Sequence, residues 1–429
     1  MSNKEIMKKR YSIILLACYF FIFLIPESNR FYISWDRSVV QVLILSLLNF
    51  TTFGFFLANN ILVKNLSRSI NERIILSYTI YIGISLISII FSENINESII
   101  IFSKYFTYLV ALISVFSLSL IIEKKFILYF LYSSALVLLL ESSSIVYNAV
   151  DLVFIQEREF QRDTYLLRSF AGNINITANS IVFKMGALYY LLFQTKNLKA
   201  LSFAYIILFL SFSALFILLT RSAFLSCATI TLLFIIWMRK KHIYRSGLIL
   251  ISIFVAFLFV QSSFNQSDQN EITDRIASIQ INTEDDSINA RLRYYSHAIK
   301  SIAKNPLTGI GIGTWKIKSI EYDLTNITGY TVPFHAHNDF LQIAAEIGLI
   351  GFAFYALIFL IPLYTLSKRI VNNKASNFDF LIILMLFAYI ADSMLNFPID
   401  RPITHIYLIF ILVAYMVDQK TKFNPNEIL

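Results

Sequence analysis

Charged residues, cysteines and internal repeats are all scarce in this sequence. Only 15% of the 429 residues are charged, whereas about a quarter are charged in a typical soluble domain. The two cysteines, Cys18 and Cys227, both lie inside apolar runs, where we expect small core residues without a redox or metal role. These features exclude a soluble enzyme, a disordered scaffold and a disulfide-stapled secreted domain. The lack of a repeat of about 20–50 residues also argues against transporters built from internal repeats.

Apolar sequence is abundant instead, at 57% of the chain, with 40 Phe and 24 Tyr. Twelve apolar runs can each form a helix of about 20 residues that crosses a bilayer. They lie near residues 11–26, 38–58, 74–91, 99–122, 126–150, 178–194, 199–218, 222–238, 246–262, 346–366, 378–396 and 403–418. The sequence therefore predicts an all-α polytopic membrane protein with about 12 transmembrane helices. No small-residue cleavage site follows the first run, which predicts a retained first helix.

The basic residues predict the orientation of these helices. With the N-terminus inside, the short inner segments contain 20 Lys and Arg residues and the short outer segments contain 7. Cytoplasmic loops have an excess of basic residues, so both termini are predicted to be cytoplasmic. Residues 263–345 then form a long, partly helical periplasmic loop, and long loops in compact proteins tend to be functional. We expect helices 1–9 in residues 1–262, and helices 10–12 with a cytoplasmic tail in residues 346–429.

One amphipathic helix is predicted inside this loop, at residues 290–304. Its apolar face, by helical spacing, consists of Leu292, Tyr295, Ile299, Ile302 and Ala303. The pair Asn305-Pro306 should end the helix, because the residue before a proline disfavours helical geometry. Arg293 is expected on the solvated face. Arg291 lies at the edge of the apolar face and needs an anionic partner, although snorkelling or a structural ion pair would explain it equally well.

The same loop contains a glycine-rich stretch, Gly309–Gly313, and a histidine motif, FHAHNDF. The glycines lack the strand and helix that a nucleotide-binding fingerprint needs, so we expect a turn. The motif places His335 and His337 next to Asn338, just before the tenth run. Histidine at this boundary suits general-base catalysis on a hydroxyl group, and a satisfied interfacial histidine is the main alternative. A metal is less favoured, because Asp339 is the only further ligand nearby.

Arginines are predicted on the same outer face. Arg168, Arg221 and Arg401 lie in three different outer connections. Snorkelling explains any one of them. Several beside a histidine motif predict an anion-binding site, because the planar guanidinium group suits phosphate oxygens.

Other ionisable groups have weaker signals. Lys104, Glu141, Lys184 and Asp392 fall inside apolar runs, where charge is costly and often functional. Lys104 and Glu141 lie near the ends of their runs and are expected to snorkel. The acidic run Glu284-Asp285-Asp286 is expected to be solvated, and no metal site is predicted there.

These residues resemble a known family. The segments "ARLRYYSHAIKSIAKNPLTGIGIGTW" and "FHAHNDFLQIAAEIGLIGFAFYALIFL" are similar to the signature region of the O-antigen ligase and polymerase superfamily. "LLTRSAF" and "RSFAGNINITANS" are similar to its upstream landmarks, and the resemblance is most specific over residues 291–351. It implies a membrane glycosyltransferase that takes a glycan from undecaprenyl pyrophosphate on the periplasmic face and needs no metal or cofactor.

The resemblance also implies roles for individual residues. His337 matches the family histidine, and Arg221 and Arg291 match family arginines. Ala290 stands where the family usually has glycine, which leaves the choice between Arg291 and Arg293 open. The arginines would stabilise charge on the pyrophosphate leaving group, and His337 would act as the base, with inversion at the anomeric centre. The expected substrate-binding residues are Arg168, Arg293, His335, Asn338 and Arg401.

Three acceptors are compatible with this chemistry. A ligase, which we favour, uses lipid A–core, a polymerase uses another lipid-linked repeat, and an O-oligosaccharyltransferase uses protein Ser or Thr. A flippase or transporter is the alternative from a different class, but it would leave the histidine motif without a role. The expected partners are the lipid-linked donor, the acceptor and the bilayer, and no nucleic acid. The expected location is the bacterial inner membrane, with the active site facing the periplasm.

Overall fold

The computed structural model describes residues 3–27, 38–158, 165–238, 243–264, 286–324 and 334–422. All regular elements in these ranges are helical, and eleven helices are long and apolar enough to cross a membrane. They are α2 (Val39–Ala58), α4 with the 3-10 turn η2 (Arg73–Phe91), α5 (Ile95–Ile122), α6 with the π-turn η3 (Lys125–Ile155), α7 (Ile174–Gln194), α8 (Leu198–Leu218), α9 (Arg221–Met238), α10 (Ile243–Phe264), α14 (Asp339–Val371), α15 (Asn377–Leu395) and α16 (Pro402–Thr421). The predicted all-α polytopic fold class is confirmed.

The first predicted run corresponds to α1 (Asn3–Phe21) and the short 3-10 turn η1 (Ile22–Leu24). This helix is not among the eleven, because its first half contains several charged residues. In its second half, Leu16, Tyr19 and Phe20 are buried in the core. Each of the twelve predicted runs therefore lies in a helix. Two further short helices, α3 (Leu62–Ile70) and α13 (Trp315–Asp323), were not predicted, because neither is a long apolar run.

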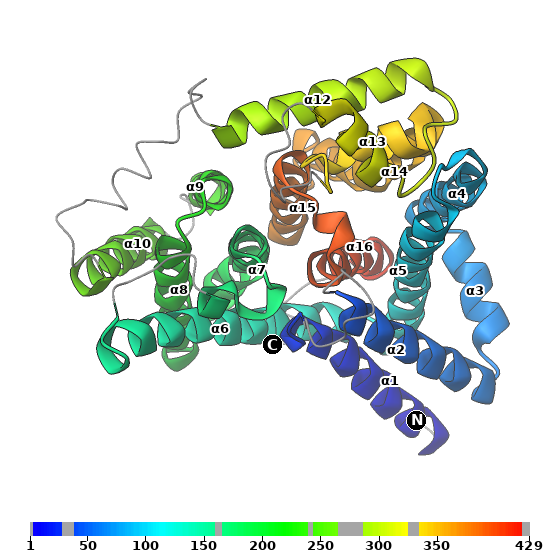
Figure 1. Ribbon diagram of the computed structural model, residues 1–429. Helices are drawn as coiled ribbons and strands as arrows, with labels where there is room; N and C mark the ends of the chain where they lie inside the picture. Colours follow the sequence, from blue (N-terminus) through cyan, green and yellow to red (C-terminus); the bar gives the residue numbers. More distant parts are fainter. Residues whose placement is uncertain are drawn as a thin grey trace.

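The helices differ in how much of their surface is covered. In α7 and α16, 94% of the most apolar stretch is buried, and Figure 1 shows both helices surrounded by others. In α2 and α10 only 28% is buried. A helix that is apolar on all sides belongs in the centre of a large bundle or against lipid. Exposed side chains such as Phe50 on α2 and Phe254 on α10 therefore mark the lipid-facing perimeter.

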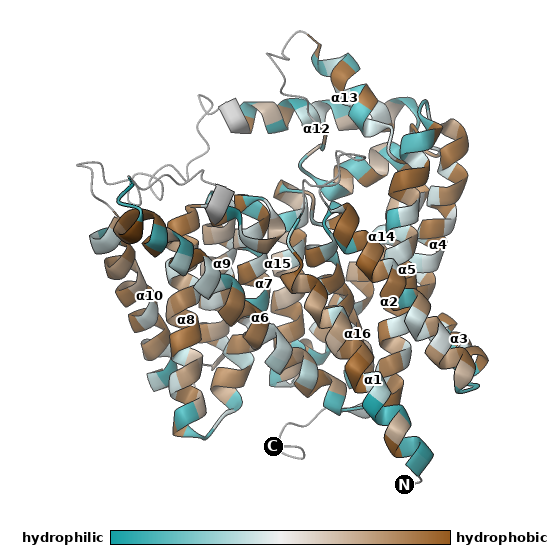
Figure 2. Ribbon diagram, turned by 60° about the horizontal axis from the view of Figure 1, so that its bottom comes forward, coloured by the Kyte–Doolittle hydropathy of each residue, from teal (hydrophilic) through white to brown (hydrophobic). Residues whose placement is uncertain are grey.

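The two ends of the bundle are built from different elements. Figure 2 shows the N- and C-termini at one end, and α12 (Asp286–Lys304) and α13 at the opposite end. This arrangement agrees with the prediction that the two termini share a side. The helices α12 and α13, which lie between α10 and α14 in sequence, are at the end away from the termini.

The amphipathic helix predicted at residues 290–304 is α12, and its predicted end at Lys304 is confirmed. Its predicted apolar face is correct only in part: Ile302 packs against buried neighbours, but other members of the face are exposed. Leu292 and Ile299 are each 56% exposed, whereas Ala298 and Ser301 are fully buried. Small side chains let α12 lie close across α14, where Ala298 packs in a cluster with Trp315, Ala336 and Ala345. A search for bulky apolar residues does not detect such a face.

The glycine-rich stretch forms turns, as predicted, and it returns to α14. The amide of Ile310 donates to the carbonyl of Ala345 at 3.0 Å, and the amide of Gly311 donates to that of Glu346 at 2.8 Å. Gly348 has a φ of +75° and interrupts α14 at this contact. A β-carbon on Gly348 would collide with the backbone of Leu307, so the close approach requires glycine.

The snorkelling predicted for Lys104 and Glu141 is wrong. Lys184 Nζ lies 2.9 Å from Glu141 Oε2, and both side chains are almost fully buried. Lys104 Nζ lies 2.8 Å from Asp400 Oδ1, although the two residues are far apart in sequence. Lys104, Glu141 and Lys184 thus each have a partner of opposite sign, which is how a membrane protein retains buried charges. Asp392 is also buried, and it accepts a hydrogen bond from Asn396 Nδ2 at 2.6 Å.

Candidate active site

The histidine motif forms a tight loop before α14. Asn338 caps this helix, since its Oδ1 accepts a hydrogen bond from the amide of Leu341 at 3.0 Å. The hydroxyl of Tyr295 on α12 donates to the carbonyl of His337 at 3.1 Å. His337 has a φ of +55°, a conformation that is uncommon for residues other than glycine. The cap and the Tyr295 contact hold this conformation, so Asn338 has a structural role in addition to the substrate contact predicted for it.

The rings of both histidines pack against Phe397, in the turn between α15 and α16. The His335 ring stacks on Phe397 with centroids 4.0 Å apart, and the His337 ring meets it edge-on at 5.3 Å. The guanidinium carbon of Arg401 lies 5.2 Å from the same ring centroid. Sequence reasoning missed Phe397, because one phenylalanine among 40 has no distinguishing pattern. It is the side chain that joins the histidine motif to Arg401.

Both histidines are neutral at physiological pH. Burial lowers the pKa of His335 to about 3, against the opposing effect of Asp400. Burial and the charge of Arg291 lower the pKa of His337 to about 4. His337 Nδ1 is buried and has no hydrogen-bond partner among the described residues. A neutral imidazole with an unused nitrogen is in the protonation state that a general base needs.

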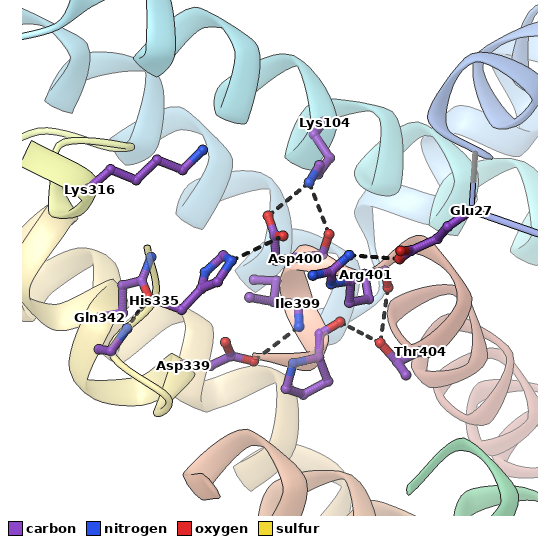
Figure 3. A network of polar contacts seen from close by, with 12 residues as sticks. Glu27, Lys104, Lys316, His335, Asp339, Gln342, Ile399, Asp400, Arg401 and Thr404 are labelled. Atoms are coloured by element: carbon purple, nitrogen blue, oxygen red, sulfur yellow. Dashed lines mark hydrogen bonds and ion pairs between the residues drawn. The ribbon is translucent and has the colours of Figure 1, made fainter. Parts of the chain in front are cut away.

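His335 belongs to a network of polar contacts (Figure 3). Its Nε2 lies 3.7 Å from Asp400 Oδ2, and Asp400 forms the ion pair with Lys104. The amide of Ile399 donates to Asp339 Oδ2 at 3.0 Å. These contacts fix the short 3-10 turn η5 (Pro398–Asp400) between α5 and α14. Because this network and Phe397 both constrain His335, its geometry suits an orienting role.

Arg291 and Arg293 differ in their partners. Arg293 Nε pairs with Asp323 Oδ1 at 3.1 Å, which joins α12 to α13. Arg291 forms no ion pair with a carboxylate in the described part of the chain, and its charge acts on His337 and Tyr295. The structure therefore favours Arg291 over Arg293 as the arginine open to an anionic ligand. This difference addresses the choice that the sequence left open.

Arg401 is joined to the segment that contains Arg168. Arg401 Nη1 donates to Glu27 Oε1 at 2.7 Å, and the Glu27 amide donates to the carbonyl of Phe170 at 3.2 Å. Gly172 has a φ of +63°, and a β-carbon there would collide with the Glu27 carboxylate. The 3-10 turn η4 (Tyr165–Ala171), which contains Arg168, is thus held beside Arg401.

Arg221 lies at the first position of α9, next to the start of α7. Thr220 Oγ1 donates to Asn175 Oδ1 at 3.3 Å, and Asn179 Nδ2 donates to Ser222 Oγ at 3.4 Å. Thr177, in the same turn of α7, donates from Oγ1 to the carbonyl of Arg168 at 2.6 Å. The segments that contain Arg168 and Arg221 therefore both pack against the N-terminal part of α7. A continuous series of contacts leads from them through Glu27 and Arg401 to Phe397 and the histidines.

No group of three or more His, Cys, Asp or Glu side chains in the described residues has an arrangement that could hold a metal ion. Glu284 and Asp285 of the acidic run, and the side chain of Asp286, lie outside the described residues.

Residues 206–356 match the O-antigen ligase family. This segment contains six of the predicted site residues: Arg221, Arg291, Arg293, His335, Asn338 and His337. A candidate polysaccharide ligase of Rickettsia felis is 35% identical over 92 residues, or 20% of this chain and 22% of that protein. One from Rickettsia conorii is 28% identical over 113 residues, or 25% of this chain and 26% of that protein. The chain thus matches about a quarter or less of the length of these relatives. Over this segment the chain is similar to the O-antigen ligase family, in agreement with the resemblance of its motifs.

Proposed function

We propose that this protein is a membrane glycosyltransferase that transfers a glycan from undecaprenyl pyrophosphate to a hydroxyl of lipid A–core, as an O-antigen ligase. The observation that carries the proposal is His337, a neutral and buried histidine whose Nδ1 has no hydrogen-bond partner among the described residues. It lies beside Arg291, which has no ion pair within the same part of the chain. The family match over residues 206–356 and the ligase names of the relatives support a ligase-type function. The donor, the acceptor and the mechanism are part of the proposal.

The proposed reaction is a single displacement. The acceptor hydroxyl oxygen attacks the anomeric carbon of the glycan while the bond to the pyrophosphate oxygen breaks, and its electron pair leaves with the lipid pyrophosphate. The proton of the hydroxyl passes to His337, which is neutral above a pKa of about 4. One displacement inverts the anomeric centre. His335 positions the loop or the acceptor without taking the proton.

The arginines stabilise the leaving group. Negative charge grows on the pyrophosphate oxygens as the glycosidic bond breaks, and cationic donors that are already in place stabilise it without reorganisation. Arg291 and Arg221 have this role, with Arg168 beside Arg221. Arg401 already pairs with Glu27, so a larger part of its charge is used within the protein. We therefore assign Arg401 a structural role, in which its ion pair with Glu27 holds the elements of the site together.

The function is tested with purified protein and an undecaprenyl-pyrophosphate glycan, supplied separately with lipid A–core, with a second lipid-linked glycan, or with a Ser/Thr peptide. We expect a glycosylated lipid A–core, formed equally well in EDTA. Product only with the second glycan would replace the ligase with a polymerase, and product only with the peptide would replace it with a protein O-oligosaccharyltransferase. An intact donor in all three reactions would contradict a transferase.

The proposed location is the bacterial inner membrane, with His337 on the periplasmic side. Lys196 lies in the connection between α7 and α8, and Lys300 lies on α12 at the opposite end; both are exposed. A membrane-impermeant thiol reagent added to spheroplasts should label a Lys300→Cys variant and spare a Lys196→Cys variant. The reverse pattern, or equal labelling, would contradict the orientation.

A further inference from the structure

A basic pocket lies at the end of the bundle where α1 begins. It has a volume of about 310 Å³ and lies between α1, α3 and the C-terminal part of α5. Its basic lining consists of Lys8, Lys9, Lys64 and Arg68, and Glu5 is the one carboxylate in the lining. A second pocket of about 260 Å³ shares Lys8 and is lined mainly by apolar groups, including Met7, Tyr11 and Phe55.

The cations of this pocket have no ion-pair partners among the residues that the structure describes. None of the four basic lining residues lies within 4.0 Å of a carboxylate oxygen in the described part of the chain. The pKa of Lys8 is lowered, first by burial and then by the charges of Lys4 and Lys64. The like charges are therefore close enough to repel one another, and a bound anion would relieve that repulsion.

Asn65 supplies a buried hydrogen-bond donor in the same lining. It is only 6% exposed, and its Nδ2 has no hydrogen-bond partner among the described residues. Buried polar groups normally have a partner, and an unused amide donor costs free energy. One amide donor with several lysine and arginine groups is a set that suits phosphate oxygens.

The surroundings of the pocket are those of a membrane surface. On α3, the basic residues Lys64 and Arg68 alternate with exposed apolar side chains, with Val63 81% exposed and Ile70 49% exposed. A short amphipathic helix of this kind lies in the headgroup region, with its apolar side chains in the lipid. The adjoining apolar pocket gives space for the start of an acyl chain. A ligand with a phosphate group in the basic pocket and an acyl chain in the apolar pocket would be a phospholipid.

We propose that the pocket lined by Lys8, Lys64, Arg68 and Asn65 binds the phosphate headgroup of an anionic phospholipid, in the leaflet on the side of the two chain termini. The site lies at the opposite end of the bundle from His337, so the inference does not depend on the proposed transfer reaction. The lipid would fix α1 and α3 at the membrane surface. Each lysine near an anionic surface adds roughly a fivefold factor to such binding.

The test measures lipid binding to the purified full-length protein by native mass spectrometry, with phosphatidylglycerol or phosphatidylcholine added. We expect specific retention of phosphatidylglycerol. The double variant Lys8→Gln/Lys64→Gln should weaken it by roughly 25-fold, and Asn65→Leu by a smaller factor of roughly fivefold. The matched control Lys196→Gln/Lys199→Gln removes two exposed charges at the same end of the bundle and should change binding by less than about twofold.

Three results would overturn the proposal. They are equal retention of phosphatidylcholine, an equal loss in the Lys196→Gln/Lys199→Gln control, and displacement of the lipid by millimolar inorganic phosphate, which would indicate a site for the free anion. The variant Lys8→Arg/Lys64→Arg keeps both charges and should retain the lipid. Its retention, with an unchanged elution volume in size-exclusion chromatography for all variants, separates loss of the site from loss of folding.

Discussion

The histidine site and the basic pocket, which lie at opposite ends of the bundle, use cationic side chains in different ways. At the end that contains α12, α13 and the histidine motif, several cations are paired: Lys104 with Asp400, Arg401 with Glu27 and Arg293 with Asp323. At the end where α1 begins, Lys8, Lys64 and Arg68 line a pocket without ion-pair partners in the described chain. At the first end, ion pairs fix the geometry of the site, and Arg291, which has no ion pair among the described residues, can bind an anionic ligand. The second is a basic surface that an anion can neutralise.

This difference shows what pairing does for a site. An ion pair with low exposure holds two elements in one geometry, since separating the charges leaves each of them poorly solvated. Catalysis needs such fixed geometry around the reacting groups. Binding of a lipid headgroup needs a net positive charge at the surface. The same residue types therefore have different roles according to their carboxylate partners.

The largest expected effect is at His337. We expect His337→Ala to lower the transfer rate by about 10²–10⁴-fold, because the acceptor hydroxyl loses its general base. The assay is transfer from the lipid-linked donor by purified protein, with donor binding measured in parallel and expected to persist. His335→Ala should be milder. The control His297→Gln replaces a histidine of α12 that has no assigned role. Full activity of His337→Ala would remove it as the base.

Arg291 gives the next largest effect. Arg291→Lys keeps the charge but loses the planar fork, so the transfer rate should fall by about 10²–10³-fold, by analogy with removal of one oxyanion donor. Arg221→Lys should behave similarly. Arg293→Lys should cause a smaller loss, since Arg293 pairs with Asp323. The three variants are compared by kcat/KM for the donor. A larger loss for Arg293 than for Arg291 would show that the open cation was assigned wrongly.

The Glu27–Arg401 pair tests whether paired cations contribute more to the free energy of unfolding than the cations of the basic pocket do. The double-mutant cycle of Glu27→Gln and Arg401→Gln should give a coupling energy of about 1–3 kcal/mol, because the pair has low exposure. Unfolding in mixed micelles with increasing SDS measures it. At the other end, Lys64→Gln should change stability by less than about 0.5 kcal/mol, as Lys64 has no ion-pair partner in the described part of the chain. Equal effects at the two ends would remove the contrast between them.

The smallest expected effect is that of pH on the wild-type rate. With the pKa of His337 lowered to about 4, the base stays neutral throughout pH 5.5–8, and kcat/KM should vary by less than about twofold. A histidine with the usual pKa of about 6.5 would be about nine-tenths protonated at pH 5.5. A tenfold fall in rate between pH 7 and 5.5 would therefore show that burial does not neutralise His337 in the working enzyme.

Some features of the candidate site could be predicted from the local sequence, and others could not. The end of α12 at Lys304 was predictable, because Asn305-Pro306 stops a helix whatever surrounds it. The buried face of α12 was not, because Ala298 and Ser301 are buried only where α14 passes close to them. Likewise, Phe397 became part of the site through its contacts with two histidines that are distant in sequence.

The sequence by itself determined the all-α class, the positions of the apolar helices and the short motif that contains His337, since each depends on composition or spacing within one segment. Only the tertiary structure decided which charges are paired. Lys104 with Asp400, and Glu27 with Arg401, are separated by roughly 300 or more residues, and no local pattern relates them. Whether an arginine or lysine is open to a ligand depends on such a partner. The difference between Arg291 and Arg293, and the open basic pocket at the other end, are therefore properties of the folded bundle.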